Sequence, residues 1–260
     1  MARLHLFELE DQAWFPGTLR DAGTAYLRLV LELSGYAKLF VPKLCEVLER
    51  TGETRILDLC SGGGGAVPVV VDELARAGIE TTVQLTDFYP NRGAFRAIAA
   101  SSQGRIDYAA EPLDATAVPG HLHGLRTFFN AFHHFRPEAA RRILASTVRA
   151  RRPIAIFEVV SREALPLVSI AVSPIQVLLL MPFVKPRRIA WLFFTYLIPL
   201  VPLLVFWDGL VSCLRVYSVA ELRALVGGIP EADGWTWDIG RIRLGRAPAY
   251  ATYLVGYPPR

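Results

Sequence analysis

The sequence Ile56-Leu57-Asp58-Leu59-Cys60-Ser61-Gly62-Gly63-Gly64-Gly65 decides the fold of this chain. A short apolar run over 55–59 carries one carboxylate, Asp58, and passes into four glycines, after which residues 67–77 show helical spacing. Glycines let a backbone adopt positive φ and approach a ligand closely, and the helix that follows directs free N–H groups at that ligand. The pattern therefore predicts a nucleotide-like ligand bound at the end of a strand.

Strands and helices alternate onward from this loop. We predict strands at 55–59, 81–86, 106–109, 125–129, 154–160, 235–244 and 249–257, and helices at 67–77, 91–101 and 138–149. Such alternation is typical of a parallel sheet with helices on both faces, and the last two strands form a hairpin. The expected fold class is α/β: a Rossmann-like, seven-stranded sheet, mostly parallel with a C-terminal antiparallel hairpin, plus N-terminal helices and an apolar helical insertion.

The chain of 260 residues suits one large α/β domain, or one domain with an insertion. We predict an N-terminal helical cap at 1–50, a ligand-binding Rossmann-like core at 51–163, an apolar helical insertion or lid at 164–209, and a segment at 210–260 that completes the core. Within the last segment, Ser218 and Glu221 form a capping box, which predicts a helix as far as Val226.

Charge and cysteine usage exclude several classes of protein. The formal net charge is +4, and no long Lys/Arg run is interleaved with aromatic residues, so we expect no nucleic-acid partner. The three cysteines, Cys45, Cys60 and Cys213, are far apart and odd in number, which indicates neither a disulfide framework nor a zinc site. We predict no metal site. The N-terminal sequence lacks the apolar core of a secretory signal, so a reducing, cytoplasmic location is expected.

Three more polar residues follow strands of the predicted sheet. Asp87 ends the second strand, where a carboxylate can accept both ribose hydroxyls, and Asp114 follows the third strand, where it suits an adenine amino group. Asn130 follows the fourth strand and begins Asn-Ala-Phe-His-His-Phe. A dinucleotide site is the alternative, but the loop lacks Gly-x-Gly-x-x-Gly spacing and Asp58 precedes it. Polar groups at four successive strand ends favour one composite ligand site.

Together these motifs resemble those of the class I S-adenosylmethionine (SAM)-dependent methyltransferases, over roughly residues 50–160 and 216–257. The His-His-Phe at 133–135 is similar to that of the ubiquinone/menaquinone methyltransferases and their small-molecule relatives. Cys60 and Ser61 depart from the commoner Gly, and Gly65 extends the loop, which we expect to alter loop detail and not the ligand. The whole chain also resembles a bacterial group of these enzymes, through Trp-Phe-Pro at 14–16 and Trp-Asp-Gly at 207–209, a likeness that indicates no particular acceptor.

The resemblance implies SAM as the cofactor and S-adenosylhomocysteine (SAH) as its product. It implies that the methionine part of SAM lies near Asp58, Cys60, Ser61, Gly62, Gly63 and Gly64, the ribose at Asp87 and Phe88, the adenine at Asp114 and Ala115, and the sulfonium near Asn130, Ala131 and Phe132. The activity it implies is methyl transfer to an oxygen, nitrogen or carbon atom of a small acceptor.

Methyl transfer depends mainly on proximity and orientation, and a base is needed only where the acceptor must lose a proton. The candidates for a catalytic base are His133, His134 and Glu158, which follow or end strands on the expected methyl side. A neutral imidazole can take a proton at pH 7. Two structural alternatives stay open: the histidines pack and hydrogen-bond around the loop, or Glu158 forms an ion pair with Arg162 or Arg215.

N-terminal helices usually cap the acceptor pocket in the family that the chain resembles. The candidate acceptor-contacting residues are Trp14, Phe15, Arg20, Asp21, Tyr26, Arg162, Trp207 and Arg215, with core packing as the alternative for the aromatic ones. No Asn-Pro-Pro-Tyr follows the fourth strand. That sequence marks enzymes that methylate amide or exocyclic nitrogens of nucleic acid or protein, so its absence argues against a nucleic-acid substrate.

The least expected feature is the apolarity of residues 164–207. Neither 164–184 nor 189–207 contains a charged residue, and Lys185, Arg187 and Arg188 lie between them. A membrane-spanning hairpin is opposed by five prolines and by this basic turn, which would lie on the far side of the membrane. We favour a helical lid on the inner membrane surface, or a soluble lid or homodimer interface. Both predict a small lipophilic acceptor; a non-catalytic SAM-binding or membrane-surface protein that retains the fold is the alternative function.

Overall fold

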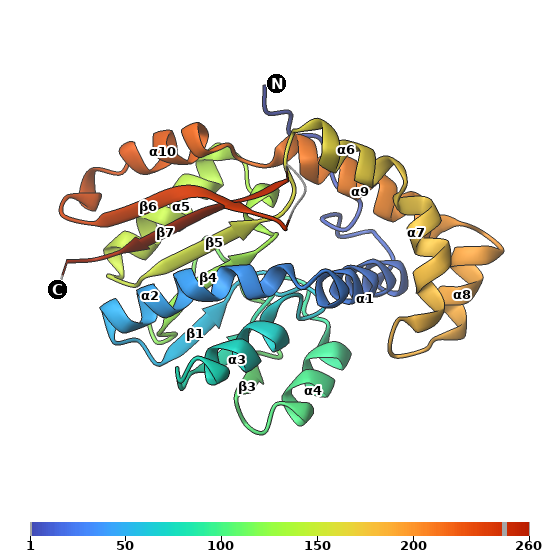
Figure 1. The fold of residues 1–260 in the computed structure, drawn as a ribbon, viewed down its shortest axis with the longest axis horizontal. Helices are drawn as coiled ribbons and strands as arrows, with labels where there is room; N and C mark the ends of the chain where they lie inside the picture. Colours follow the sequence, from blue (N-terminus) through green and yellow to red (C-terminus); the bar gives the residue numbers. More distant parts are fainter. Residues whose placement is uncertain (1, 246–248, 260) are drawn as a thin grey trace.

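One sheet of seven strands, in the order β3-β2-β1-β4-β5-β7-β6, organises the chain (Figure 1). The structure is a computed structural model that describes residues 2–245 and 249–259. The strands are β1 (Arg55–Asp58), β2 (Thr82–Leu85), β3 (Ile106–Tyr108), β4 (Leu125–Phe129), β5 (Ile154–Glu158), β6 (Thr236–Arg243) and β7 (Tyr250–Tyr257). Strands β1 to β5 are parallel, whereas β7 is antiparallel to both β5 and β6. The predicted Rossmann-like α/β class, with its C-terminal antiparallel hairpin, is confirmed.

The strand order reverses direction between β1 and β4, and this determines where a ligand can bind. Strand β1 pairs with β2, which places Asp58 opposite Leu85, and with β4, which places Asp58 opposite Thr127. The helix after β1 packs on one face of the sheet and the helix after β4 packs on the other. Ligands of open α/β sheets bind in the crevice that opens at such a point, at the carboxyl ends of the strands.

Helices cover both faces of the sheet. On one face lie α2 (Val41–Thr51), α3 (Val67–Arg76) and α4 (Arg92–Ser101), and on the other lie α5 (Pro137–Arg149) and α10 (Val219–Gly227). Because both faces are covered, every residue of β5 is buried. The predicted Ser218–Glu221 capping box begins α10. Short 3-10 helices occur at Tyr36–Phe40 (η1), Phe132–His134 (η2), Met181–Phe183 (η3) and Pro230–Ala232 (η4).

The N-terminal helix and the apolar insertion pack on each other beside the sheet. Helix α1 (Gly17–Ser34) shares a buried cluster with α7 (Ser173–Leu180), α8 (Ile189–Tyr196) and α9 (Leu200–Arg215), in which Tyr26 meets Trp191 and Val201. Helix α6 (Ala164–Ala171) joins β5 to α7. Figure 1 shows α7 and α8 at the end of the molecule beyond α1, away from the sheet. Helix α9 continues without a break past residue 209, the predicted end of the insertion.

The outer surface of the insertion is apolar. Ile189, at the start of α8, is 87% exposed. Large apolar side chains are exposed along the whole insertion: Leu165, Val168, Val172, Ile175, Leu179, Phe183, Leu192, Leu197, Ile198 and Leu203. In residues 2–245 and 249–259, no single helix has the length and apolarity to cross a membrane, whereas two bent pairs (α6 with α7 and η3, and α8 with α9) meet those criteria as pairs. The insertion therefore presents an apolar surface that neither α1 nor the sheet covers.

Candidate active site

Backbone hydrogen bonds hold the loop after β1 between β4 and β2. The N–H of Leu59 donates to the carbonyl of Thr127, and the N–H of Ser61 donates to the carbonyl of Thr86, both at 2.9 Å. Cys60, between them, has φ +60°, a left-handed conformation that is rare for a residue with a side chain. The chain therefore turns sharply at the end of β1, as a ligand-binding loop requires.

Two of the loop glycines are required by their surroundings. Gly64 has φ +93°, and a Cβ there would lie 2.1 Å from Cδ1 of Ile98 in α4. A Cβ at Gly63 would lie 3.2 Å from the carbonyl oxygen of Thr24 in α1. The predicted cofactor loop is thus packed between α4 and the N-terminal helix.

Asp58 is buried beneath this loop, and both of its carboxylate oxygens accept a hydrogen bond. The hydroxyl of Ser61 donates to Oδ2 at 2.6 Å, and the hydroxyl of Thr127 donates to Oδ1 at 2.7 Å. Burial outweighs these two hydrogen bonds and, with a smaller contribution from Asp87, raises the pKa of Asp58 to about 7. A carboxyl group with this pKa ionises readily when a positively charged ligand group binds beside it.

Asp87 and Asp114 keep acceptor positions free. Oδ2 of Asp87 accepts from the N–H of Gly62 and Oδ1 accepts from the N–H of Tyr89, both at 2.7 Å. An ionised carboxylate has about four acceptor positions, so about two remain for the hydroxyls of a ribose. Oδ1 of Asp114 accepts both the N–H and the hydroxyl of Thr116 at 2.8 Å, which leaves Oδ2 for an amino group.

The other residues predicted to line the cofactor site lie on the same edge of the sheet, but they differ in exposure and in hydrogen bonding. Phe88 is 52% exposed beside Asp87, and Ala115 is buried. Asn130 has φ +54°, and its Oδ1 accepts from the N–H of Val159 at 2.7 Å, so it ties the end of β4 to the end of β5. Ala131 is buried, and Phe132 is fully buried in the core on the α5 and α10 face. The Phe132 side chain therefore faces the core, so only its backbone can face the predicted cofactor site.

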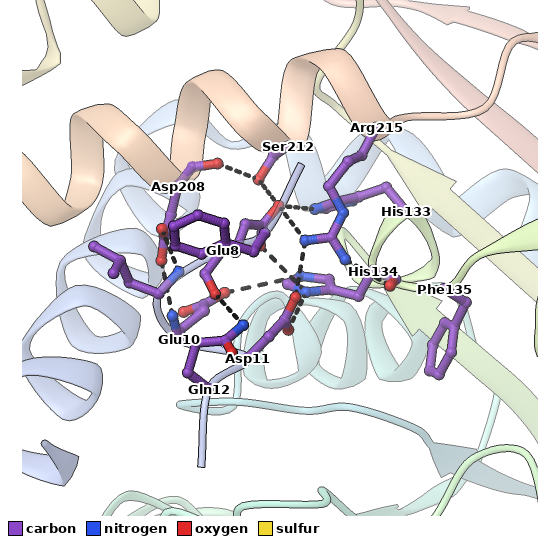
Figure 2. A network of polar contacts seen from close by, with 12 residues as sticks. Glu8, Glu10, Asp11, Gln12, His133, His134, Phe135, Asp208, Ser212 and Arg215 are labelled. Carbon is purple, nitrogen blue, oxygen red and sulfur yellow. Dashed lines mark hydrogen bonds and ion pairs between the residues drawn. The ribbon is translucent and has the colours of Figure 1, made fainter. Parts of the chain in front are cut away.

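A second group of polar side chains, which we call the acidic–histidine cluster, lies at the carboxyl ends of β4 and β5 (Figure 2). Its members are Glu8, Glu10, Asp11, His133, His134, Glu158, Asp208, Ser212 and Arg215. They come from the segment before α1, from η2, from β5 and from α9. Segments far apart in the sequence therefore meet where the acceptor chemistry was predicted.

Glu158 has His133 as its partner in this cluster. Nδ1 of His133 lies 2.8 Å from Oε2 of Glu158, and the backbone N–H of His133 donates to Oε1 at 3.0 Å. The predicted ion pairs of Glu158 with Arg162 or Arg215 are wrong: Arg162 pairs with Glu221 at the start of α10, and Arg215 pairs with two carboxylates of the N-terminal segment. A carboxylate at Nδ1 orients the imidazole ring and leaves Nε2 as its second polar atom.

Carboxylates surround the imidazole of His134. Its Nδ1 lies 2.7 Å from Oδ1 of Asp11 and 3.2 Å from Oε2 of Glu8. Burial disfavours the charged ring, but the carboxylates of Glu8, Asp11 and Glu10 outweigh burial and raise the pKa of His134 to about 10. This environment favours the imidazolium form at neutral pH, which argues against the predicted role of His134 as a neutral base.

Sequence reasoning missed four acidic members of the cluster, Glu8, Glu10, Asp11 and Asp208. The carboxylate of Asp208 accepts from the backbone N–H groups of Leu9 and Glu10 at 2.8 and 3.1 Å, and Nη1 of Arg215 donates to Oδ2 of Asp11 at 2.8 Å. These contacts join residues about 200 positions apart, which no local pattern reveals. The available signals were the acidic stretch at 8–11 and the isolated Asp208 after a long uncharged run.

Most residues predicted to contact the acceptor hold the N-terminal segment or pack in the core. Trp14 is 69% exposed, whereas Phe15 and Tyr26 are buried against the insertion. Arg20 donates to the carbonyls at positions 10 and 12, and its guanidinium lies 4.5 Å from the ring centre of Tyr89. Asp21 pairs with Arg188, and the indole N–H of Trp207 donates to the carbonyl of Phe7.

The acidic–histidine cluster and the cofactor loop lie at the carboxyl ends of neighbouring strands, since β1 pairs with β4 and β4 pairs with β5. Burial raises the pKa of the Cys60 thiol in the loop well above its usual value, and the carboxylates of Asp87, Asp58, Asp11 and Asp114 raise it further. The two groups of side chains therefore occupy the same edge of the sheet.

No protein-family model matches the sequence, and no curated protein matches it. Solved structures do match. The methyltransferase domain of a bacterial protein, CtHen1, superposes with a TM-score of 0.52 at 10% identity, over 85% of this chain and 98% of that chain. The S-adenosylmethionine-dependent methyltransferase SibL gives a TM-score of 0.50 at 15% identity, over 86% of this chain and 56% of that chain. The chain has the class I methyltransferase fold.

An O-methyltransferase family protein from Burkholderia thailandensis is also similar, with a TM-score of 0.49 at 15% identity over 91% of this chain. The chain covers 58% of that protein and 56% of SibL, somewhat more than half of either length. Within the methyltransferase fold, the Asp58–Gly65 loop and Asp87 occupy the carboxyl ends of β1 and β2, on one side of the crevice where the strand order reverses. The acidic–histidine cluster occupies the other side.

Proposed function

We propose that this chain is a SAM-dependent methyltransferase that acts on a small lipophilic acceptor. The observation that carries the cofactor assignment is the carboxylate of Asp87, which receives the N–H of Gly62 in the glycine loop and keeps acceptor positions for a ribose diol. The buried Asp58 carboxyl suits the positively charged methionine part of SAM. Asp114 Oδ2 suits the adenine amino group.

Titration calorimetry with SAM and with SAH tests this assignment. The wild-type chain is expected to bind both, and Asp87→Ala is expected to lose binding because the ribose hydroxyls lose their acceptor. Asp107→Ala removes an exposed carboxylate from β3 and is the matched control, with binding unchanged. Wild-type affinity in Asp87→Ala would refute the ribose assignment, and a wild-type chain that binds neither SAM nor SAH would refute the proposed function.

The insertion supports a lipophilic acceptor presented at a membrane surface. Its exposed apolar side chains lie beside a basic turn in which Lys185 and Arg187 are exposed, while Arg188 pairs with Asp21. An apolar surface flanked by cations suits the boundary between acyl chains and anionic headgroups. We therefore assign the apolar surface of 164–207 to an anionic bilayer, with the acceptor drawn from it.

Vesicle flotation tests the membrane contact. The wild-type chain is expected to float with phosphatidylcholine vesicles that contain phosphatidylserine, and the double variant Phe183→Ser/Ile189→Ser is expected to stay in solution. Leu33→Ser, an equally exposed apolar position in α1, is the control. A wild-type chain that does not float refutes the membrane contact. If sedimentation then shows a dimer that the double variant dissociates, the same surface is a homodimer interface instead.

The alternative function is a SAM-binding protein without catalysis, at a membrane surface or in solution. Production of SAH from SAM in the presence of membrane lipid extract separates the two functions. Turnover that depends on the extract supports the enzyme. Tight SAM binding with no SAH formed from quinol, isoprenoid or fatty acceptors supports the non-catalytic alternative.

A further inference from the structure

Two buried polar atoms of the acidic–histidine cluster lack hydrogen-bond partners. Nε2 of His133 and Oε2 of Glu8 make no hydrogen bond to any described residue, although the side chains are 3% and 0% exposed. The other oxygen of Glu8 is occupied, with the Ser212 hydroxyl at 3.0 Å and Nη1 of Arg215 at 3.2 Å. Unsatisfied polar atoms in a buried site are costly, so something outside the chain is expected to satisfy them.

The hydrogen bond between His133 and Glu158 determines which ring nitrogen of His133 is left without a partner. Glu158 occupies Nδ1 of His133, so the nitrogen left without a partner is Nε2, which lies 3.7 Å from Oε1 of Glu8. This distance is too long for a hydrogen bond between the two groups. A cation between the imidazole and the Glu8 carboxylate satisfies both.

The geometry fits coordination of a metal ion. Ligand atoms of Glu8, His133 and His134 lie within 4.8 Å of one another. Two ligands of a tetrahedral zinc ion with bonds of about 2.1 Å are about 3.4 Å apart. The Glu8 carboxylate lies close to this spacing from His133, since its Oε1 is 3.7 Å from Nε2, and its other oxygen, Oε2, has no hydrogen bond to a described residue and is the one available to an ion. His134 Nδ1 also lies 3.2 Å from Glu8 Oε2, although its hydrogen bond goes to Asp11.

The charge of the cluster favours the same ligand. Five carboxyl groups, those of Glu8, Glu10, Asp11, Glu158 and Asp208, outnumber the two cations among the cluster members, Arg215 and the His134 imidazolium. Arg215 lies between Glu8 and Asp11 and contacts Oε1 of Glu8, not Oε2. A divalent ion on the histidine side would offset negative charge that Arg215 does not reach.

We infer that Glu8, His133 and His134 bind a divalent transition-metal ion such as Zn²⁺, which displaces the proton of His134 when it binds, with Glu158 orienting His133 through its Nδ1–H. Imidazole with carboxylate favours zinc and its neighbours over the harder Mg²⁺ and Ca²⁺, and a carboxylate on the second ring nitrogen is the usual support of a metal-bound histidine. Three protein ligands leave a coordination position for an oxygen atom of a bound molecule. This site departs from the metal-free prediction made from cysteine spacing, and it does not depend on SAM binding.

Metal titration of the full chain tests the site. Zn²⁺ added to the metal-free protein is expected to bind with a stoichiometry of one, measured by calorimetry and by metal content after desalting. Co²⁺ is expected to give the visible absorption bands of a low-coordinate nitrogen and oxygen site. Glu158→Gln is expected to weaken Zn²⁺ binding about 10–100-fold, as loss of a supporting hydrogen bond does, and Glu8→Gln and His133→Gln are expected to weaken it further.

His121→Gln, which removes an exposed histidine, is the control for adventitious binding and is expected to leave the affinity unchanged. Cooperative urea unfolding, followed by tryptophan fluorescence, shows whether each variant is folded. The inference is overturned if the wild-type chain binds no stoichiometric Zn²⁺, or if folded Glu8→Gln and Glu158→Gln bind it as tightly as wild type. If Glu8→Gln does not fold, Glu158→Gln and the Co²⁺ spectrum of the wild-type chain decide.

Discussion

Asp58→Asn is expected to stabilise the chain far more at pH 8 than at pH 5. Burial raises the pKa of Asp58 from 3.8 to about 7 in the folded chain. Between these two values the folded chain keeps a proton that the unfolded chain has lost, so the free energy of unfolding falls as pH rises from about 4 to about 7. Each pKa unit corresponds to about 1.4 kcal/mol, which gives a total fall of about 4 kcal/mol.

Part of this fall is complete by pH 5, and about 3 kcal/mol remains between pH 5 and pH 8. Asparagine does not titrate, and its carboxamide can still bond to the hydroxyls of Ser61 and Thr127. The difference in unfolding free energy between variant and wild type should therefore increase by about 3 kcal/mol from pH 5 to pH 8. Urea unfolding at the two pH values, followed by tryptophan fluorescence, measures it.

Other titrating groups cancel in this comparison because variant and wild type share them. Asp107→Asn, which changes an exposed carboxylate of β3, should show the same difference at both pH values. An Asp58→Asn difference that does not change between pH 5 and pH 8 would refute the reasoning. It would mean that the hydroxyls of Ser61 and Thr127 hold Asp58 as a carboxylate despite burial.

Two further predictions concern the loop and the buried ion pair. Gly64→Ala should lower the free energy of unfolding by about 1–3 kcal/mol and weaken SAM binding, since its φ is +93° and the new Cβ would lie 2.1 Å from Ile98 Cδ1. Gly65→Ala, where a Cβ would meet open space, should lower the free energy of unfolding and the SAM affinity less than Gly64→Ala does. Urea unfolding and calorimetry measure the two effects, and equal effects in both variants would contradict the packing argument. Arg215→Met should lower the free energy of unfolding by about 3–5 kcal/mol because it removes the guanidinium from the fully buried Glu8 carboxylate and the half-buried Asp11 carboxylate. Arg28→Met, which breaks an exposed pair with Glu32, should lower the free energy of unfolding by less than about 1 kcal/mol. Equal losses in Arg215→Met and Arg28→Met would contradict the argument from burial.

The fold could be predicted from the sequence because its determinants are local. All seven strands follow from apolar runs that end at turn residues, and the start of α10 follows from the Ser218–Glu221 capping box. The glycine loop and Asp87 were likewise marked by their positions at strand ends. Boundaries differ by a few residues, as with β5, predicted at 154–160 and observed at Ile154–Glu158.

The acceptor side could not be predicted in the same way, because its contacts are not local. Arg215 reaches Asp11 across 204 positions, and nothing in the sequence near Glu158 indicates that His133 and not an arginine becomes its partner. The charge state of His134 depends on three carboxylates that the fold brings from the N-terminal segment. Such states become visible only when the tertiary structure sets the distances.

Helix α9 connects the apolar surface of the insertion to the acidic–histidine cluster. One end carries the exposed Leu200 and Leu203, and the other end carries Asp208, Ser212 and Arg215 in the acidic–histidine cluster. From Leu203 to Arg215 the helix rises about 18 Å, so a tilt of about 5° about its outer end would displace the inner end by about 1.5 Å. That displacement is enough to break the 2.8 Å contact between Arg215 and Asp11. Contact at the apolar end of α9 is thus mechanically connected to the ion pairs of the acidic–histidine cluster.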